Sequence, residues 1–275
     1  PRIFLGRKKI LLELLSWILI VGINLVPLVT MVLTAFVKGL GVGYSLSNMS
    51  LANFTQILGN AKSMNAIKNS VILGIGTCLI CVVLGTVVAY LMVRKPGKTI
   101  RIVDSIISVP YSIPGIILGL GLIITWASPL PLINKTIYNT VFMLLVSYVV
   151  RFTSLQIRSS STAILQLDVS MEEAASASGA GGLKKWMQII IPLIFPATAS
   201  GMGLVFISAL TELTTSTLLW SAGSEVIGVV VYNYTSAGYT TTACAMSTIV
   251  LLALIVLLLV YKGAGLIVKN VEGRA

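Results

Sequence analysis

Six long stretches of mostly apolar residues, separated by shorter polar segments, run through the chain. They cover about residues 10–37, 66–93, 102–126, 136–157, 189–212 and 242–261. A helix needs roughly 20 apolar residues to cross the hydrocarbon core of a bilayer, so each stretch is long enough for one span. The pattern therefore predicts an all-α integral membrane protein with six transmembrane helices.

The composition points to the same class. Of the 275 residues, 56% are hydrophobic and 10% are charged, and the mean hydropathy is +1.00, whereas a soluble domain is about 25% charged. A net charge of +11 would favour a nucleic-acid partner in a soluble protein. Here the basic residues gather in loops and at the termini, as a membrane-topology signal does. We therefore expect a lipid membrane around the chain and no nucleic-acid partner.

The distribution of lysine and arginine predicts the orientation, because cytoplasmic loops carry an excess of these residues. With the N-terminus inside, the cytoplasmic segments hold most of the 19 basic residues. These are Arg2, Arg7, Lys8, Lys9, Arg94, Lys95, Lys98, Arg101, Arg151, Arg158, Lys184, Lys185, Lys262, Lys269 and Arg274. The outer loops keep Lys38, Lys62, Lys68 and Lys135. We expect both termini in the cytoplasm and a first span that is retained, since no small-residue cleavage site follows it.

A short amphipathic segment between the fourth and fifth apolar stretches carries the most informative motif. It reads Glu173-Ala174-Ala175, then Gly179, and ends with Ile189 and Pro192. Ser170 and Glu173 have the spacing of an S-x-x-E capping box, and acidic residues favour the positive end of a helix. Gly179 can end that helix in a left-handed conformation. The segment therefore predicts a short cytoplasmic helix shaped to enter a groove on a partner.

The spacing E-A-A-x3-G-x9-I-x-L-P resembles the coupling loop of permease subunits from ABC-type importers, with Ile191 where leucine is usual. The resemblance implies a single permease domain of the type I importer fold over residues 1–275, with a core at 66–262 and a coupling loop at about 159–188. It also implies residues that couple the permease to an ATP-hydrolysing subunit. These are Glu172, Glu173, Ala174, Ala175, Gly179, Ile189 and Pro192.

A proline-rich segment in the third stretch extends the resemblance. Residues 108–115, with Gly119 and Gly121 after them, look like the third core helix of this superfamily, closest to its ferric-iron, polyamine, thiamine and molybdate branches. Pro110 and Pro114 predict a kink, because a proline frees backbone carbonyl groups. Close helix packing explains the glycines equally well. We take Pro114 as a candidate moving part of a translocation pathway.

Glu212 is the acidic residue that lies deepest in an apolar stretch. It follows Pro192 by about 20 residues, or roughly 30 Å along a helix, which places it near the outer face. An ionisable group at such depth marks a pathway or gate, with Thr215 and Ser216 beside it. Alternatively, Glu212 reaches interfacial water or binds the hydroxyls of its threonine and serine neighbours. Residues 211–219 resemble the E-L-x-x-T/S-x-L-L segment of ferric-iron permeases.

The sequence argues against ATP hydrolysis by this chain. Gly97-Lys98-Thr99 resembles the end of a phosphate-binding loop, but Met92 stands where that motif needs its first glycine. We expect no cofactor on this chain, with ATP and magnesium bound by the partner ATPase. Three cysteines and no histidine also argue against a disulfide framework or a histidine-based metal site.

The resemblance implies a complete transporter in a bacterial-type inner membrane. Its parts are an ATPase dimer, an extracytoplasmic solute-binding protein and a second permease subunit, either a copy of this chain or a paired or fused half. Ferric iron is the expected cargo, and a phosphonate, a polyamine or thiamine are the alternatives. An ion-coupled secondary transporter is the rival class, and it usually shows intramembrane charge pairs or inverted repeats.

Overall fold

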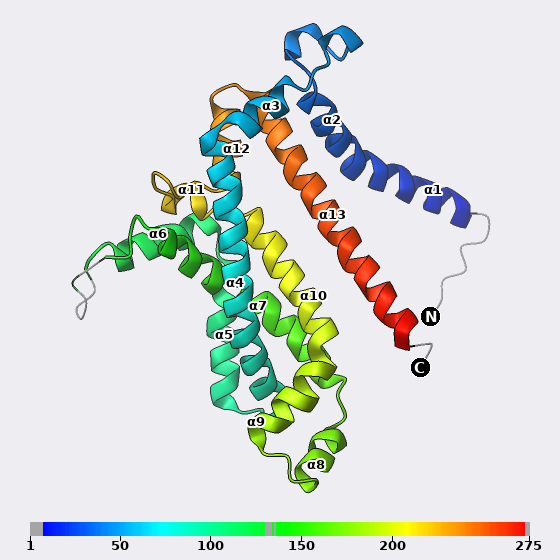
Figure 1. Cartoon of the computed structure of the whole chain (residues 1–275), viewed down its shortest axis with the longest axis vertical. Helices are drawn as coiled ribbons and strands as arrows, with labels where there is room; N and C mark the ends of the chain where they lie inside the picture. Colours follow the sequence, from blue (N-terminus) through cyan, green and yellow to red (C-terminus); the bar gives the residue numbers. More distant parts are fainter. Residues whose placement is uncertain (1–7, 130–133, 135, 273–275) are drawn as a thin grey trace. The chain divides into compact units, whose positions relative to one another are not determined.

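Regular structure in the computed structural model is helical, apart from one antiparallel bridge between Val37 and Met49, within the residues that it describes (Figure 1). The described residues are 8–129, 134 and 136–272, with side chains described from 9 to 260 within these ranges. The chain forms two compact units. One comprises residues 1–61 and 231–275, and the other comprises residues 62–230.

The first unit consists of the two terminal spans and a loop. Its elements are α1 (Lys8–Ile20), a π-helical turn (Val21–Leu25), α2 (Val26–Ala35), two 3₁₀ turns (Leu40–Val42 and Leu46–Asn48), α3 (Ala52–Gly59) and α13 (Thr240–Glu272). Helices α2 and α3 pack on α13. Asn53 links α3 to the end of α2, because its side-chain amide donates to the carbonyls of Ala35 and Val37, each at 2.9 Å.

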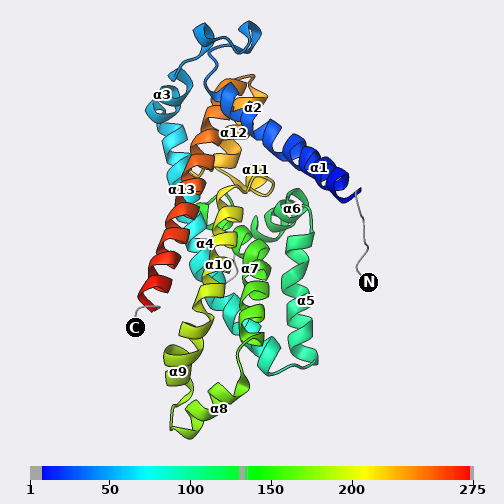
Figure 2. The same ribbon diagram turned by 90° about the vertical axis from the view of Figure 1, so that its right-hand side faces the viewer.

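The second unit is a helical bundle that carries both candidate sites. Its elements are α4 (Ala61–Arg94), α5 (Lys98–Ser112), α6 (Gly115–Trp126), α7 (Val141–Leu165), α8 (Val169–Ala177), α9 (Gly182–Lys185), a π-helical turn (Trp186–Ile190), α10 (Ile191–Leu210) and α11 (Ser216–Leu219). The boundary between the units falls within α12 (Ile227–Ser236). Helix α7 packs against both α10 and α5 (Figure 2). Leu73, Met143, Tyr148 and Val205 are buried in its core.

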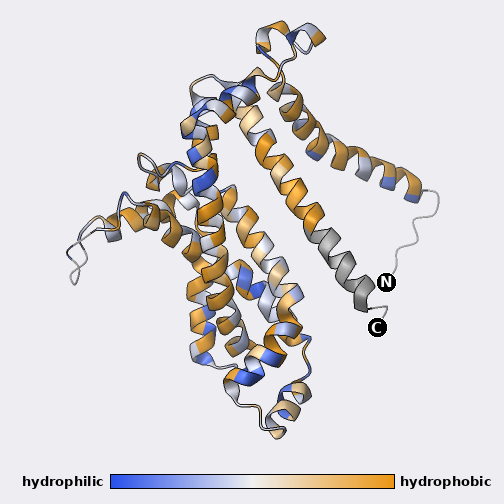
Figure 3. Cartoon of the chain, in the orientation of Figure 1, coloured by the Kyte–Doolittle hydropathy of each residue, from blue (hydrophilic) through white to orange (hydrophobic). Residues whose placement is uncertain are grey.

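The predicted spans agree with the helices. Five helices among the described residues are long and apolar enough to cross a membrane. They are Lys9–Ala35, Ala61–Arg94, Val141–Leu165, Gly182–Leu210 and Thr240–Val260. Apolar residues predominate on α1 and on the first half of α13, whereas α8 and α9 mix apolar and polar residues (Figure 3). Trp17 of α1 is 67% exposed, as expected of a side chain that meets lipid.

The third predicted span differs from a continuous, kinked helix. Helix α5 ends at Ser112, α6 begins at Gly115, and the two axes are bent by 112°. Pro114 explains the break, because proline has no N–H and forces the residue before it into an extended conformation. Ile113 accordingly has φ −79° and ψ 138°. Pro110, by contrast, is accommodated inside α5.

Several other predicted boundaries move, and two of them bear on the sites. The fourth span begins at Val141 rather than 136, because Thr140 caps the helix by accepting from the backbone N–H of Met143. The fifth helix ends at Leu210, so Glu212 lies in the loop after it and not on the helix. Both changes place polar residues in a cap or a loop, while the other end of α7 extends to Leu165, beyond the predicted residue 157.

The packing of α7 against α10 requires a small residue at one glycine of α10. A β-carbon at Gly201 would lie 2.7 Å from Cβ of Ser159 and 2.8 Å from Oε1 of Gln156, both on α7. A β-carbon at Gly203, two residues on, would meet nothing within 4 Å. The two glycines therefore differ, and Gly201 is the one in the helix contact.

We predict that Gly201→Ala lowers the stability of the purified protein by about 1–3 kcal/mol, because the added methyl group overpacks the α7–α10 contact. Gly203→Ala should leave stability unchanged or raise it slightly, since alanine is the better helix former. Thermal unfolding in mild detergent checks both variants. Equal melting temperatures for the two variants would contradict this role of Gly201.

Candidate functional site

The motif between α7 and α10 folds into the predicted short helix. Helix α8 (Val169–Ala177) lies with α9 at one end of the second unit (Figures 1 and 2). The predicted capping box is wrong, because Asp168 and not Ser170 is the N-cap. Asp168 has an extended backbone and its carboxylate accepts from the N–H of Ser170 at 2.9 Å. This hydrogen bond lowers the pKa of Asp168 below its ordinary value, so the cap stays charged.

The end of α8 is formed as predicted. Gly179 has φ +78°, a left-handed conformation that favours glycine. The N–H of Gly179 donates to the carbonyl of Ser176 at 3.1 Å, and the N–H of Ala180 donates to the carbonyl of Ala175 at 3.0 Å. This pair of bonds is a Schellman motif, and it ends the helix sharply.

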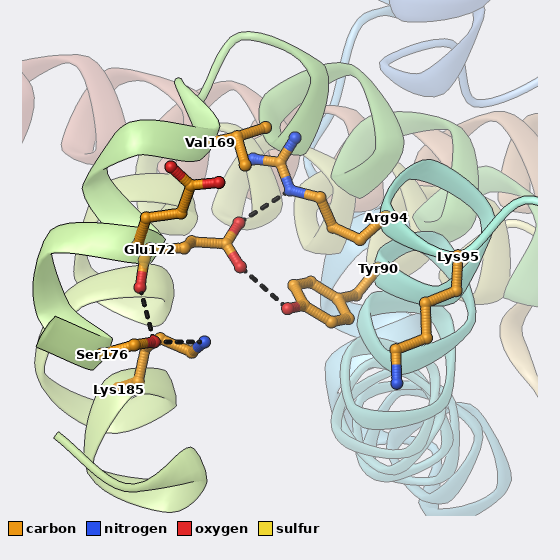
Figure 4. A pocket seen from close by; sticks show the side chains of 8 residues that line it. Tyr90, Arg94, Lys95, Val169, Glu172, Ser176 and Lys185 are labelled. Carbon is orange, nitrogen blue, oxygen red and sulfur yellow. Dashed lines mark hydrogen bonds and ion pairs between the residues drawn. The ribbon is translucent and has the colours of Figure 1, made fainter. Parts of the chain in front are cut away.

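The two adjacent acids of α8 point to different surroundings. Glu172 is buried, with 9% of its side chain exposed, and it pairs with Arg94 of α4, whose Nε lies 2.7 Å from Oε1. Its second oxygen accepts from the hydroxyl of Tyr90 at 2.8 Å. Figure 4 shows the Glu172 carboxylate between these two α4 side chains. Glu173 is exposed, because neighbouring residues on a helix are about 100° apart.

Most of the other predicted coupling residues are accessible. Ala174, Gly179 and Pro192 are exposed, Ile189 is half-buried, and Ala175 is buried. Pro192 lies in the first turn of α10, within a continuous helical stretch from Gly182 to Leu210, and it has no N–H to donate to the turn before it. A π-helical turn precedes it, at residues Trp186–Ile190. The structure thus presents Glu173 and Ala174 on a capped surface helix that connects through α9 and the π-helical turn to the long span α10.

A hollow of about 420 Å³ lies beside Glu172. Acidic, basic and aromatic side chains from α4, α8 and α9 line it (Figure 4). They are Tyr90, Arg94, Lys95, Val169, Glu172, Glu173, Ser176 and Lys185. The mixture of charges suits contact with polar groups of a protein partner better than it suits an apolar ligand.

Glu212 forms a second polar cluster in the same unit. Its side chain is 8% exposed, and Oε1 accepts from the hydroxyl of Thr214 at 2.7 Å and from the backbone N–H and hydroxyl of Thr215, each at 2.9 Å. Two of its hydroxyl neighbours therefore bind the carboxylate. Thr211 donates instead to the carbonyl of Ile207, and Ser216 bonds to Tyr148.

Arg151 completes this cluster, which corrects its predicted place among the cytoplasmic charges. It lies within α7, where Nη1 is 3.5 Å from Oε1 of Glu212 and donates to the hydroxyl of Thr214 at 2.9 Å. A charge inside a span is costly unless it is paired. The same argument, applied to an arginine inside the fourth apolar stretch and to Glu212, could have found the pair from sequence.

The bend between α5 and α6 meets the Arg151 cluster. A β-carbon at Gly115 would collide with the side chains of Thr214 and Arg151, so the backbone of α6 begins in direct contact with the ion pair. The structure therefore brings together Pro114 with Gly115, Arg151, and the loop that begins at Glu212. These groups come from three parts of the sequence, of which only Pro114 and the loop of Glu212 were predicted to share a pathway.

Sequence reasoning also missed Glu225. Its Oε1 lies 3.6 Å from Nζ of Lys62, and its Oε2 accepts from the N–H of Gly223 at 2.9 Å. Among the described residues, no group of three or more histidine, cysteine, aspartate or glutamate side chains is arranged to hold a metal ion. Cys78 and Cys81 are buried in the apolar core and are not joined by a disulfide bond.

Comparison with known proteins links this architecture to transport. Residues 81–271 match the family model described as the binding-protein-dependent transport system inner membrane component. A probable ABC transporter permease protein, y4fN of Sinorhizobium fredii, is 26% identical over 78% of this chain and 38% of its own length. The ferric transport system permease protein FbpB of Actinobacillus pleuropneumoniae is 24% identical over 82% of this chain and 32% of its own length.

Other similar proteins are named for other solutes. The molybdate/tungstate permease WtpB of Thermococcus kodakarensis is 30% identical over 54% of this chain and 58% of its own, and the putative 2-aminoethylphosphonate permease PhnV of Salmonella typhimurium is 25% identical over 78% of each chain. A crystal structure of a bacterial ABC transporter involved in alginate import has the same fold, with a TM-score of 0.70 at 17% identity, over 94% of this chain and 96% of that one.

The Arg151–Glu212 pair gives a prediction about stability. Arg151→Met leaves the Glu212 carboxylate with its hydroxyl partners but without a counter-charge, and we expect it to cost about 3–5 kcal/mol. Arg151→Met combined with Glu212→Gln removes both charges and should recover part of that loss. Arg158→Ala is the control, because that side chain is 58% exposed in its pair with Asp104 and should cost about 1 kcal/mol or less.

Thermal unfolding in detergent ranks the three variants. A double variant that is as unstable as Arg151→Met alone would contradict the pairing.

Proposed function

The chain belongs to the family of binding-protein-dependent transport system inner membrane components, the permease subunits of type I ABC importers. On that premise, we propose that it moves a solute delivered by an extracytoplasmic binding protein. ATP hydrolysis is assigned to a partner subunit that also binds the ATP and magnesium. Gly97-Lys98-Thr99 supports this assignment, because these residues begin helix α5 shortly after helix α4, whereas a phosphate-binding loop follows a strand.

The observation that carries this proposal is the capped surface helix α8. It presents Glu173 and Ala174 outward, while Glu172 is held inward by Arg94 and Tyr90. A short helix with small exposed residues can enter a groove on the ATPase closely, and the exposed carboxylate offers one charged contact. Membership of the importer family favours this reading over an ion-coupled transporter, although the Arg151–Glu212 pair is a charge pair of the kind such transporters use.

In the proposed mechanism, closure of the ATPase dimer displaces α8, and the displacement passes through the π-helical turn and Pro192 into α10. The far end of α10 leads into the loop of Glu212, Thr215 and Ser216, which contacts Arg151 and the bend at Pro114. We assign these groups to the translocation pathway or its gate. ATP can drive the change only if the ATPase docks differently in the two states.

The proposed cargo is ferric iron. The similarity to FbpB over 82% of this chain and the E-L-x-x-T/S-x-L-L segment at 211–219 support it. A phosphonate is the second candidate, because the 2-aminoethylphosphonate permease matches over 78% of both chains. A polyamine, thiamine or molybdate are further candidates of the same importer class. Function is carried by sites and not by folds, so transport assays must decide among them.

We also propose the partners and the orientation. The chain spans 38% and 32% of the length of two of the curated relatives it matches, so a second permease domain in the same polypeptide or in a separate subunit would complete the pathway. Both termini and α8 would lie on the cytoplasmic side of a bacterial-type inner membrane, because ATP is available there. The binding protein would dock on the opposite face.

The docking proposal predicts the effect of neutralising Glu173. Glu173→Gln should weaken binding of the ATPase subunit about tenfold, because a charged contact at the edge of the interface is lost. Glu13→Gln is the matched control, since it also removes an exposed carboxylate but lies on α1. Titration of the purified permease with the ATPase encoded beside it measures both affinities. Unchanged affinity for the Glu173 variant would contradict docking through this face of α8.

A further inference from the structure

Two side chains in the last turn of α4 make four contacts with the segment that carries α8 and α9, residues 166–190. Arg94 bonds to the Glu172 carboxylate and, through Nη2, to the carbonyl of Leu167 at 2.7 Å. Tyr90 donates to Glu172, and its ring lies 4.7 Å from the ring of Trp186, measured between centroids. The two side chains therefore contact Leu167, just before α8, and Trp186, just after α9; Figure 4 shows their contacts with Glu172.

These contacts join segments that are distant in the sequence. Helix α8 is already connected through the backbone to α7 on one side and, through α9, to α10 on the other. Helix α4 has no such connection to α8, since Arg94 and Glu172 are 78 residues apart. The pair therefore adds a third link between the surface helix and the membrane helices, made by side chains alone.

The link has the properties of a stiff connection. The side chains of Arg94 and Glu172 are 14% and 9% exposed, so water competes weakly for either charge. The guanidinium group donates from Nε and from Nη2 to acceptors on opposite sides of the Asp168 cap, and the single nitrogen atom of a lysine does not reproduce this planar, two-point geometry. Both carboxylate oxygens of Glu172 are occupied. Rotation of α8 relative to α4 would break several of these bonds together.

We propose that Arg94, Tyr90 and Glu172 form a positioning clamp, which fixes the face that α8 presents and transmits its displacement to α4. This role rests on the proposed function, because it assumes that an ATPase moves α8. The proposal gives the two adjacent acids of the motif different roles. Glu173 lies on the docking face, and Glu172 transmits the movement of α8 within the permease.

The clamp is tested in the complete complex of permease, ATPase and binding protein in lipid nanodiscs. The probe is the binding protein loaded with ferric iron, and the readout is its stimulation of Mg-ATP hydrolysis, because this signal must cross the permease. We expect Arg94→Lys and Tyr90→Phe to lose most of the stimulation, about tenfold, while the ATPase subunit co-purifies as with the unmodified chain. Tyr90→Phe keeps the ring against Trp186 and removes only the hydroxyl bond.

Two further variants complete the design. Lys98→Ala removes an exposed basic residue just beyond the clamp and should leave stimulation unchanged. The exchange Arg94→Glu with Glu172→Arg should recover part of the stimulation that Arg94→Glu alone loses. Full stimulation in Arg94→Lys and Tyr90→Phe would overturn the clamp, and so would loss of the ATPase subunit from those complexes. An unmodified chain that binds no ATPase would overturn the proposed function itself.

Discussion

Charges taken out of water must be paired, and this constraint organises the second unit. Arg94 and Glu172 satisfy it at the end that carries α8, and Arg151 and Glu212 satisfy it at the loop after α10. Each pair joins elements far apart in the chain, because no neighbour along the same helix could supply the opposite charge. Removing one member of a buried pair is costly, whereas an apolar pair in its place can be neutral. The main effect of such pairs is therefore to fix the relative positions of the helices and loops that carry them, and their contribution to stability is secondary.

The two pairs lie at opposite ends of one connection. Helix α10 runs from the π-helical turn after α9 to the loop of Glu212, and α7, against which it packs, carries Arg151 and leads into α8. Gly201 lets these two helices approach closely. A displacement of α8 therefore acts on two packed helices: the loop after α10 and Arg151 in the middle of α7 both contact the start of α6 at Gly115. This arrangement supports a permease in which the ATPase contact and the pathway are connected by packed helices.

Local rules predicted the features that depend on local chemistry. The apolar stretches, the left-handed Gly179 and the bend near Pro114 follow from length, from the missing Cβ of glycine and from the missing N–H of proline. The predicted N-cap was wrong because Asp168 and Ser170 are both residue types that favour the N-cap position. Only the backbone conformation shows which of them precedes the helix. The inward turn of Glu172 depends on Arg94 and Tyr90, which no spacing within the motif reveals. Arg151 was misplaced because a count of charges by segment ignores a partner in another segment.

Photo-cross-linking from α8 in native membranes tests the central claim most directly. A photoreactive amino acid in place of Ala174, which is exposed beside Glu173, should cross-link to an ATP-hydrolysing subunit. The same group in place of Ala175, which is buried, should not. An ATPase adduct from position 174 alone is the result that the account predicts. Adducts with lipid only, or no adduct with an ATPase from either position, would contradict it.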